Sequence, residues 1–278
     1  MLVPTSLDAA LEALAAHPDA HVLAGGTDLM VEVNYGHRRP QAVVVINRVA
    51  ELRGWSQEPG GILRIGATTT YTDLLAPGIA AVAPALAAAA RTVGSPQIRN
   101  AGTIGGNLAT ASPAGDTLPV LAALDAEVEI AGPTGDRRLP VLDLITGPKR
   151  TALLPGELIV AVRLAGAEPG DAQEYLKVGT RNAMVISVAG LALVFEPRRH
   201  RVRVALGSVG PGPLRAREAE AWAAKHIDWD GRTADTAVFG ALVAAAARPI
   251  DDHRSTADYR RHAVGVLAAR ALTRSLAA

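Results

Sequence analysis

The chain has 278 residues and a formal net charge of +1, and 49% of its residues are hydrophobic while only 3% are aromatic. A charge this close to zero gives no electrostatic basis for nucleic acid or an anionic membrane as a general partner. Because the chain contains no cysteine, it cannot by itself form disulfides, thiolate nucleophiles, zinc–thiolate sites or iron–sulfur clusters. The length predicts about two domains, and the composition predicts an aliphatic core.

The start of the sequence predicts a folded helix and not a targeting segment. It has neither the basic region nor the long apolar run of a signal sequence, and no stretch reaches the ~18 uninterrupted apolar residues of a membrane span. Ser6, or Thr5 before it, can cap a helix whose leucines at 7, 11 and 14 share one face. We therefore expect a cytoplasmic protein without a membrane span.

Short strands and helices alternate along the first 165 residues, and no solenoid repeat is present. Apolar runs bounded by Gly, Pro or Asp predict the strands, and alanine-rich or amphipathic runs predict the helices. In chain order we expect a short strand from residue 21, strands over 41–49 and 61–70, a short helix over 71–76, a helix over 80–91, a short helix and a strand over 118–132, and extended segments over 137–147 and 157–164.

A stretch at 165–171 combines Pro, Gly and acidic residues and is the best candidate for a linker. It divides the chain into a domain over 1–165 and a second domain over 171–278. The basic cluster at 198–203 lacks interleaved aromatic residues, so a solvated turn is favoured over a nucleic-acid site. In the second domain we expect one or two strands over 175–196, a further strand over 200–210, and helices over 236–247 and 255–276.

Two segments share a Gly-Gly pair after an apolar approach: VLAGGTDLM at 22–30 and GTIGGNLATASPAGD at 102–116. Glycine allows positive φ and close backbone approach, and successive inward N–H groups form an anion-binding nest. Neither segment carries Lys or Arg, so an anion would be held by backbone amides and by Thr27, Thr103 and Asn107. Two facing nests suit the diphosphate of a dinucleotide. The alternative is that each pair is an ordinary turn.

The common nucleotide-binding and catalytic patterns are missing. Neither G-x-G-x-x-G nor G-x-x-x-x-G-K-[ST] occurs, so a Rossmann nicotinamide site and a P-loop site are unsupported. There is also no Ser/His/Asp, paired-carboxylate or metal-spaced histidine pattern. We therefore predict no catalytic residue and no metal ligand on this chain.

Five segments carry a resemblance to a known family: PTSLDAAL, VLAGGTDL, RNAGTIGGNLATASPAGDTLPVLAALDA, GPKRTALLPGELIVAVRL and KVGTRNAMVISVAGL. Through them, and in the family's order, the chain closely resembles the flavin-binding medium subunit of the molybdenum hydroxylases, the family of aerobic carbon monoxide dehydrogenase and xanthine dehydrogenase. The resemblance implies an α+β fold. It consists of a two-subdomain FAD-binding fold of the PCMH/vanillyl-alcohol-oxidase type, followed by a C-terminal domain of a three-stranded sheet and helices.

The same resemblance implies which residues contact FAD, with the two glycine segments on its diphosphate. For Asp116 the alternative role is a helix N-cap, and for Lys177 it is that of an ordinary exposed lysine. For Val93 and Ile159 the alternative is core packing. Residues 185–186 are expected against the isoalloxazine ring. The implied FAD contacts are Leu23, Ala24, Gly25, Gly26, Thr27, Asp28, Leu29, Val93, Thr103, Ile104, Gly105, Gly106, Asn107, Asp116, Ile159 and Lys177.

The resemblance implies an FAD-carrying electron-transfer subunit of a molybdopterin-dependent hydroxylase or dehydrogenase. Its partners would be a large molybdopterin subunit and a small subunit with [2Fe–2S] clusters, in a dimer of heterotrimers, and its FAD would reduce NAD⁺, quinone or oxygen. The absence of cysteine fits clusters that are held by a partner. The FAD is expected to be non-covalent, because Thr27 follows the first Gly pair where tethering oxidases carry histidine. The alternatives are a free-standing FAD oxidoreductase with its own small substrate, and a scaffold subunit without flavin.

Overall fold

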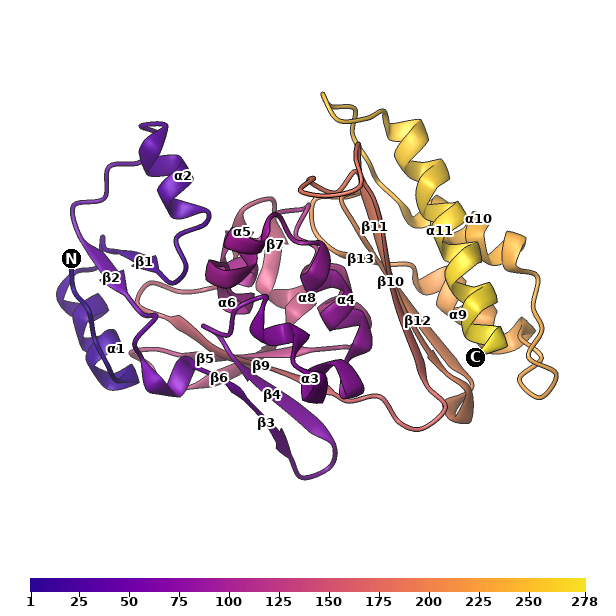
Figure 1. Cartoon of the computed structure of the whole chain (residues 1–278), viewed down its shortest axis with the longest axis horizontal. Helices are drawn as coiled ribbons and strands as arrows, with labels where there is room; N and C mark the ends of the chain where they lie inside the picture. The colour runs from indigo at the N-terminus through magenta and orange to yellow at the C-terminus, as the bar shows by residue number, and fades with distance from the viewer.

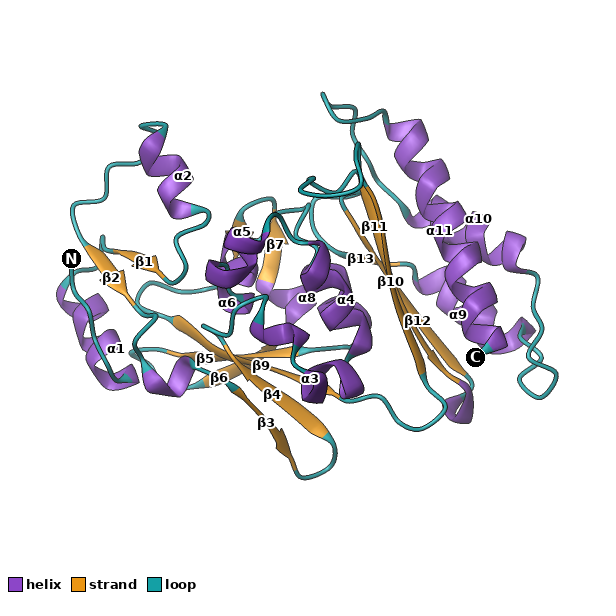
Figure 2. Ribbon diagram, in the orientation of Figure 1, coloured by secondary structure: helices purple, strands orange, loops and turns teal.

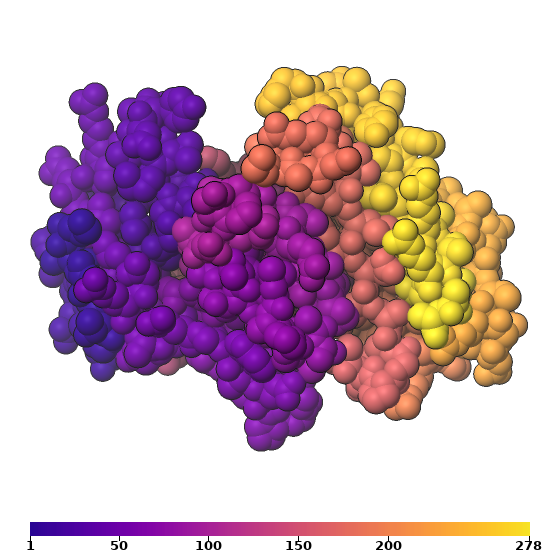
Figure 3. Space-filling view, viewed as in Figure 1, coloured from indigo at the N-terminus to yellow at the C-terminus, as the bar shows by residue number.

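The computed structural model describes all residues from 1 to 278, and three parts lie side by side along its long axis (Figure 1). The same order crosses the surface in the space-filling view, from indigo through magenta to yellow (Figure 3). In the N-terminal part, Ser6 caps the first helix by accepting a hydrogen bond from the N–H of Ala9, as predicted. The elements of this part are α1 (Leu7–Ala16), β1 (His21–Leu23), α2 (Leu29–Asn34), β2 (Val43–Val45), which pairs in parallel with β1, and the 3₁₀ helix η1 (Ala50–Leu52).

The central part is a five-stranded antiparallel sheet in the order β3-β4-β9-β5-β6, with a group of short helices packed on it (Figure 2). Its sheet strands are β3 (Trp55–Glu58), β4 (Ile62–Gly66), β5 (Glu127–Ala131), β6 (Arg137–Pro140) and β9 (Leu158–Ala165). Its other elements are η2 (Asp73–Leu75), α3 (Pro77–Val82), α4 (Pro84–Thr92), α5 (Pro96–Ala101), α6 (Ile104–Thr110), α7 (Thr117–Ala123), α8 (Val141–Leu144) and the small hairpin β7 (Ile145–Gly147) and β8 (Arg150–Thr151).

The C-terminal part is an antiparallel sheet in the order β10-β11-β12-β13, with three helices on one face. The longest helix has 21 residues, and none of the helices combines the length and apolar composition that crossing a bilayer requires. The elements of this part are β10 (Ala172–Val178), β11 (Ala189–Glu196), η3 (Pro197–Arg199), β12 (Arg201–Gly207), β13 (Leu214–Arg215), α9 (Arg217–His226), α10 (Thr236–Ala246) and α11 (Ala257–Ala277).

The C-terminal sheet is buried on both faces, and this fixes its position beside the central part. Side chains alternate between the two faces of a strand. On β11, Leu191 and Leu193 face the core under α9, α10 and α11, whereas Ala192 and Val194 join the core of the central part, where α4 and α7 pack. The whole of β11 is therefore buried. The loop between β10 and β11 is held beside the central part as a consequence.

The fold agrees with the expected α+β class, with a sheet-and-helix domain at the C-terminus. The expectation of three strands in the C-terminal sheet is wrong, because the two-residue strand β13 pairs with β12 as a fourth strand. The helix expected over 80–91 is wrong, because it is two helices that meet at Pro84. Ala83 before this proline has φ −140° and ψ 62°, since a proline disfavours helical backbone at the preceding residue. Strand β3 and helix α9 were not predicted, and the second glycine pair lies in a helix, α6, and not in a loop.

Candidate functional site

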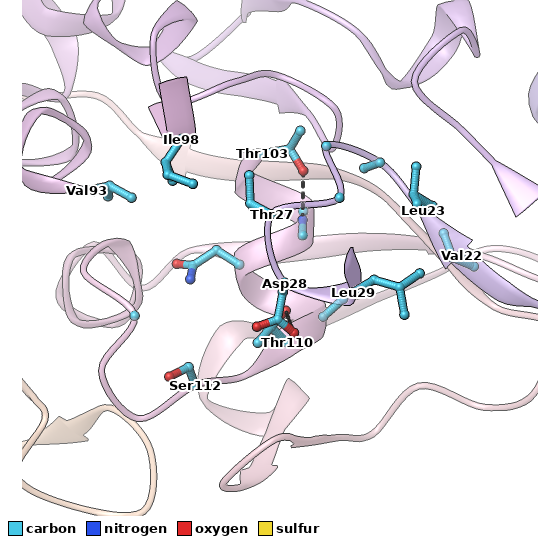
Figure 4. A pocket seen from close by; sticks show the side chains of 18 of the residues that line it. Val22, Leu23, Thr27, Asp28, Leu29, Val93, Ile98, Thr103, Thr110 and Ser112 are labelled. Atoms are coloured by element: carbon cyan, nitrogen blue, oxygen red, sulfur yellow. Dashed lines mark hydrogen bonds between the residues drawn. The ribbon is translucent and has the colours of Figure 1, made fainter. Parts of the chain in front are cut away.

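A cleft of about 590 Å³ brings together residues of all three parts, and Figure 4 shows it from close by. This volume lies within the ~300–1,000 Å³ that is typical of sites for small ligands and cofactors. Its walls include both glycine segments. The lining residues come from the segments 21–29, 93–98, 103–116, 149–159 and 184–186, with single residues from elsewhere.

The two glycines of the first segment have different roles. A methyl group on Gly25 would lie 1.7 Å from the carbonyl oxygen of Ala101, so the first segment packs directly on the backbone that leads into the second segment. Gly26 has φ +73°, a left-handed conformation that side chains rarely adopt. Gly25 thus brings two segments that are far apart in the sequence into contact, and Gly26 turns the chain along the cleft.

The first segment presents a row of uncommitted donors. None of the five backbone N–H groups of residues 24–28 donates a hydrogen bond within the chain. All five residues line the cleft, and successive N–H groups of this kind form an anion-binding concavity. Buried or half-buried backbone N–H groups are normally paired, so this row is suited to an anionic ligand.

The second glycine pair uses its N–H groups internally. Thr103 is the N-cap of α6 and its hydroxyl accepts from the N–H of Gly106 at 3.0 Å, an interaction drawn in Figure 4. Gly105 donates to the carbonyl of Ala67 at 2.9 Å, and a methyl group there would lie 2.6 Å from the side chain of Ala67. The expectation of two facing nests of free amides is therefore wrong for this pair. Gly105 allows α6 to approach Ala67, the residue that follows β4.

Other polar groups of the second segment are fixed by the surrounding structure. The side-chain oxygen of Asn107 accepts from the hydroxyl of Thr117 at 2.6 Å, which leaves the amide nitrogen without a hydrogen bond within the chain. Thr110 donates to the Asp28 carboxylate at 3.4 Å across the two segments (Figure 4). The cleft therefore offers neutral donors along one wall and a carboxylate at its edge.

A buried polar network forms the boundary between the cleft and the C-terminal part. Asp116 lines the cleft and is 8% exposed; its carboxylate accepts from the Lys177 ammonium at 2.7 Å and from the Tyr175 hydroxyl at 2.8 Å. Lys177 also donates to the carbonyl of Thr92. Burial raises the pKa of the Asp116 carboxyl, and the Lys177 charge acts in the opposite direction. The Asp116 side chain does not cap α7.

Charged residues from distant segments meet at the rim of the cleft. Lys149 donates to Glu32 at 2.9 Å, and Arg38 pairs with the same carboxylate and contacts His21. Hydrogen bonding from Lys149 lowers the pKa of the Glu32 carboxyl. This rim was not predicted from the sequence, because its members lie up to 117 positions apart.

One ion pair shapes the wall where β9 begins. Arg137 donates twice to Glu157, at 2.7 and 2.8 Å, and Glu157 also accepts from the N–H of Leu154. These hydrogen bonds from the Arg137 guanidinium hold the pKa of the Glu157 carboxyl below its usual range. The turn at 152–157 is thereby fixed beside Ile159, which also lines the cleft.

All the predicted site residues line this one cleft except Ile104 and Lys177. Ile104 is fully buried in the core of the central part, and the Lys177 ammonium is taken up by Asp116. The expected pair 185–186 also lines the cleft. Lining residues that were not predicted include His21, Glu32, Arg38, Tyr71, Ile98, Lys149 and Met184.

The family comparisons cover nearly the whole chain. The family described as "FAD binding domain in molybdopterin dehydrogenase" matches residues 1–164. The family described as "CO dehydrogenase flavoprotein C-terminal domain" matches residues 174–275.

Individual relatives are similar over most of their length. The xanthine dehydrogenase FAD-binding subunit of Escherichia coli O157:H7 is 32% identical over 97% of this chain and 93% of that protein. The carbon monoxide dehydrogenase medium chain of Hydrogenophaga pseudoflava is 33% identical over 91% of this chain and 88% of that protein. A solved structure of the carbon monoxide dehydrogenase from H. pseudoflava, which lacks the Mo-pyranopterin moiety of its molybdenum cofactor, superposes with a TM-score of 0.90 at 31% identity, covering 99% of this chain and 96% of that chain.

Proposed function

Because the chain belongs to the family of FAD-binding subunits of the molybdenum hydroxylases, we propose that it carries electrons from the iron–sulfur clusters of a partner subunit to an external acceptor. Bound FAD supplies this chemistry, since a flavin accepts and donates either one or two electrons. The protein's part is to hold and orient the cofactor. It needs no acid, base or nucleophile of its own for this function.

The row of free N–H groups along 24–28 carries the proposal. Within this row, Gly25 packs on the carbonyl of Ala101, so both glycine segments border one cleft of cofactor size. Neutral backbone donors fit a diphosphate without a lysine or arginine. The residues present therefore fit FAD. We propose a non-covalent complex, with the diphosphate on residues 24–28 and against α6.

The proposal includes partner subunits. The chain has no cysteine, so the [2Fe–2S] clusters have to be on another chain. We propose a large molybdopterin subunit and a small iron–sulfur subunit as partners, in a dimer of heterotrimers in the cytoplasm. The division of this chain into domains over 1–165 and 171–278 belongs to the same proposal. The substrate would be oxidised on the large subunit and not on this chain.

The test begins with the chain purified alone. We expect flavin absorption bands, with FAD released intact by acid, and no turnover of a small substrate until both partners are added. A colourless chain that cannot be reconstituted with FAD would contradict flavin binding. Turnover by the chain alone would instead support a free-standing FAD oxidoreductase.

A further inference from the structure

 
We propose that Arg260 is the positioning residue that holds a flap of the chain over the bound flavin. The flap is the loop over 179–187 between β10 and β11, and its residues Met184, Val185 and Ile186 line the cleft. The inference rests on the proposed function, since it takes the cleft to be the FAD site.

The flap has almost no hydrogen bonds of its own. Within 179–187 the only ones run from the Arg181 guanidinium to the carbonyl of Met184. The N–H of Val188 donates to the carbonyl of Val178 at 2.8 Å and closes the base of the loop. Met184 and Ile186 are 55% and 61% exposed, so contacts at the tip do not fix it. The position of the flap therefore depends on its base.

Arg260 holds that base from inside the protein. It lies in the first turn of α11 and is only 2% exposed. Its Nη1 donates to the carbonyl of Val188 at 3.1 Å and to the carbonyl of Ser208 at 2.9 Å, and its Nη2 donates to Asp252 at 2.5 Å. One planar guanidinium thus joins the residue that follows the flap, the residue that follows β12 and the segment before α11.

This arrangement is a poor choice for stability alone. Arg260 shares its one carboxylate partner with Arg254, and its Nε has no hydrogen-bond partner. The hydroxyls of Ser187 and Ser208, at the same base, also lack partners. A buried ion pair is often no more stabilising than well-packed apolar residues of similar volume would be. Directed bonds to two carbonyls give Arg260 a different use, which is to set the geometry of the flap.

The decisive variant is Arg260→Lys, which keeps a positive charge but has one terminal nitrogen in place of the planar fork that bonds Asp252 through Nη2 and both carbonyls through Nη1. In the FAD-loaded full chain we expect about tenfold faster FAD release and greater quenching of flavin fluorescence by iodide. In the same variant, amide hydrogen exchange over 179–188 should accelerate. The matched control is Arg215→Lys, because Arg215 is also a buried arginine that bonds two carboxylates and a carbonyl, but it does not line the cleft.

A second variant tests whether Arg260 acts through the flap. Ile186→Ser changes an exposed side chain and leaves the buried base intact. It should also speed FAD release, and the double variant should release FAD no faster than the faster single variant. Equal release rates in Arg260→Lys and Arg215→Lys, or additive effects in the double variant, would overturn the inference. A wild-type chain that binds no FAD would instead show that the proposed function has failed.

Discussion

Single glycines determine how closely the walls of the cleft approach each other. Gly25 and Gly105 are required because backbone or a methyl group occupies the place of their missing side chains, whereas Gly26 is required for its positive φ. The sequence shows the same Gly-Gly letters twice. It does not show that the N–H groups of the first pair are free, whereas those of the second pair donate to Thr103 and Ala67 within the chain.

We expect Gly25→Ala to lose FAD. The new methyl group would collide with the carbonyl of Ala101, so the first glycine segment would have to move away from the second. The ratio of flavin to protein absorbance after gel filtration measures the effect. Gly61→Ala is the control for a general loss of stability, because its φ of +75° strains alanine there, but the methyl group meets nothing within 4 Å and the residue does not line the cleft. Full flavin content in Gly25→Ala would contradict the role given to this contact.

The Glu157 carboxyl should make stability depend on pH. Its pKa is lowered in the folded chain by Arg137, so its stabilising contribution is present above the unfolded pKa of about 4.3 and is lost as pH falls through the folded pKa. We expect Glu157→Gln to lower the melting temperature at pH 7 and to differ less from the wild type below about pH 4. Thermal unfolding across this range is the measurement. A difference that is constant with pH would rule out the ion pair as its source.

At the scale of elements, α10 and α11 cross at a pair of glycines. A methyl group on Gly240 would lie 2.6 Å from the carbonyl of Gly265, and one on Gly265 would lie 3.0 Å from the carbonyl of Gly240. This close crossing lets α11 lie against both α10 and the C-terminal sheet. The position of Arg260 in the first turn of α11 depends on it.

Gly240→Ala should therefore destabilise the chain by about 1–3 kcal/mol, although alanine favours helix, because overpacking separates the two helices. Urea unfolding gives the free energy. Ala241→Ser, on the exposed side of the same helix, should stay within about 0.5 kcal/mol of the wild type. An unchanged midpoint in Gly240→Ala would mean that the helices can move apart freely.

Local signals predicted the elements whose ends are marked in the sequence. The cap at Ser6, the strands β11 and β12, and the helices α10 and α11 were expected from periodicity and capping. The helix over 80–91 failed because its apolar pattern continues through Pro84. Helix α6 was missed because two adjacent glycines disfavour helix locally, and packing against Ala67 outweighs that preference.

At the scale of the whole molecule, the site is assembled from segments that the sequence keeps apart. The glycine segments could be named in advance because each is a continuous motif. The rim pair of Lys149 and Glu32, and the network of Asp116, Tyr175 and Lys177, could not, since tertiary packing alone brings them together. Lys177 illustrates this difference. It was predicted from the sequence as an FAD contact, whereas in the fold it does not line the cleft and its ammonium donates to Asp116, which does.

Lys177 should link the C-terminal part to the rest of the chain. In Lys177→Met the Asp116 carboxylate stays buried without its cation, so we expect a loss of about 3–5 kcal/mol in unfolding free energy. Adding Asp116→Asn should recover part of this loss, because the uncompensated charge is then removed. Urea unfolding of the single and double variants gives the comparison. Equal losses in both would mean that charge pairing is not what Lys177 contributes.

The open row of N–H groups along 24–28 has a consequence for the newly made chain. Before FAD binds, only water can accept hydrogen bonds from these N–H groups. The stretch between β1 and α2 is therefore held to the rest of the chain by few hydrogen bonds. A hundredfold excess of FAD over its dissociation constant would add about 2.7 kcal/mol to the folded state. Proteolytic nicking should therefore begin in this stretch when flavin is scarce and cease once it is supplied. The lifetime of the subunit would then follow the availability of its cofactor.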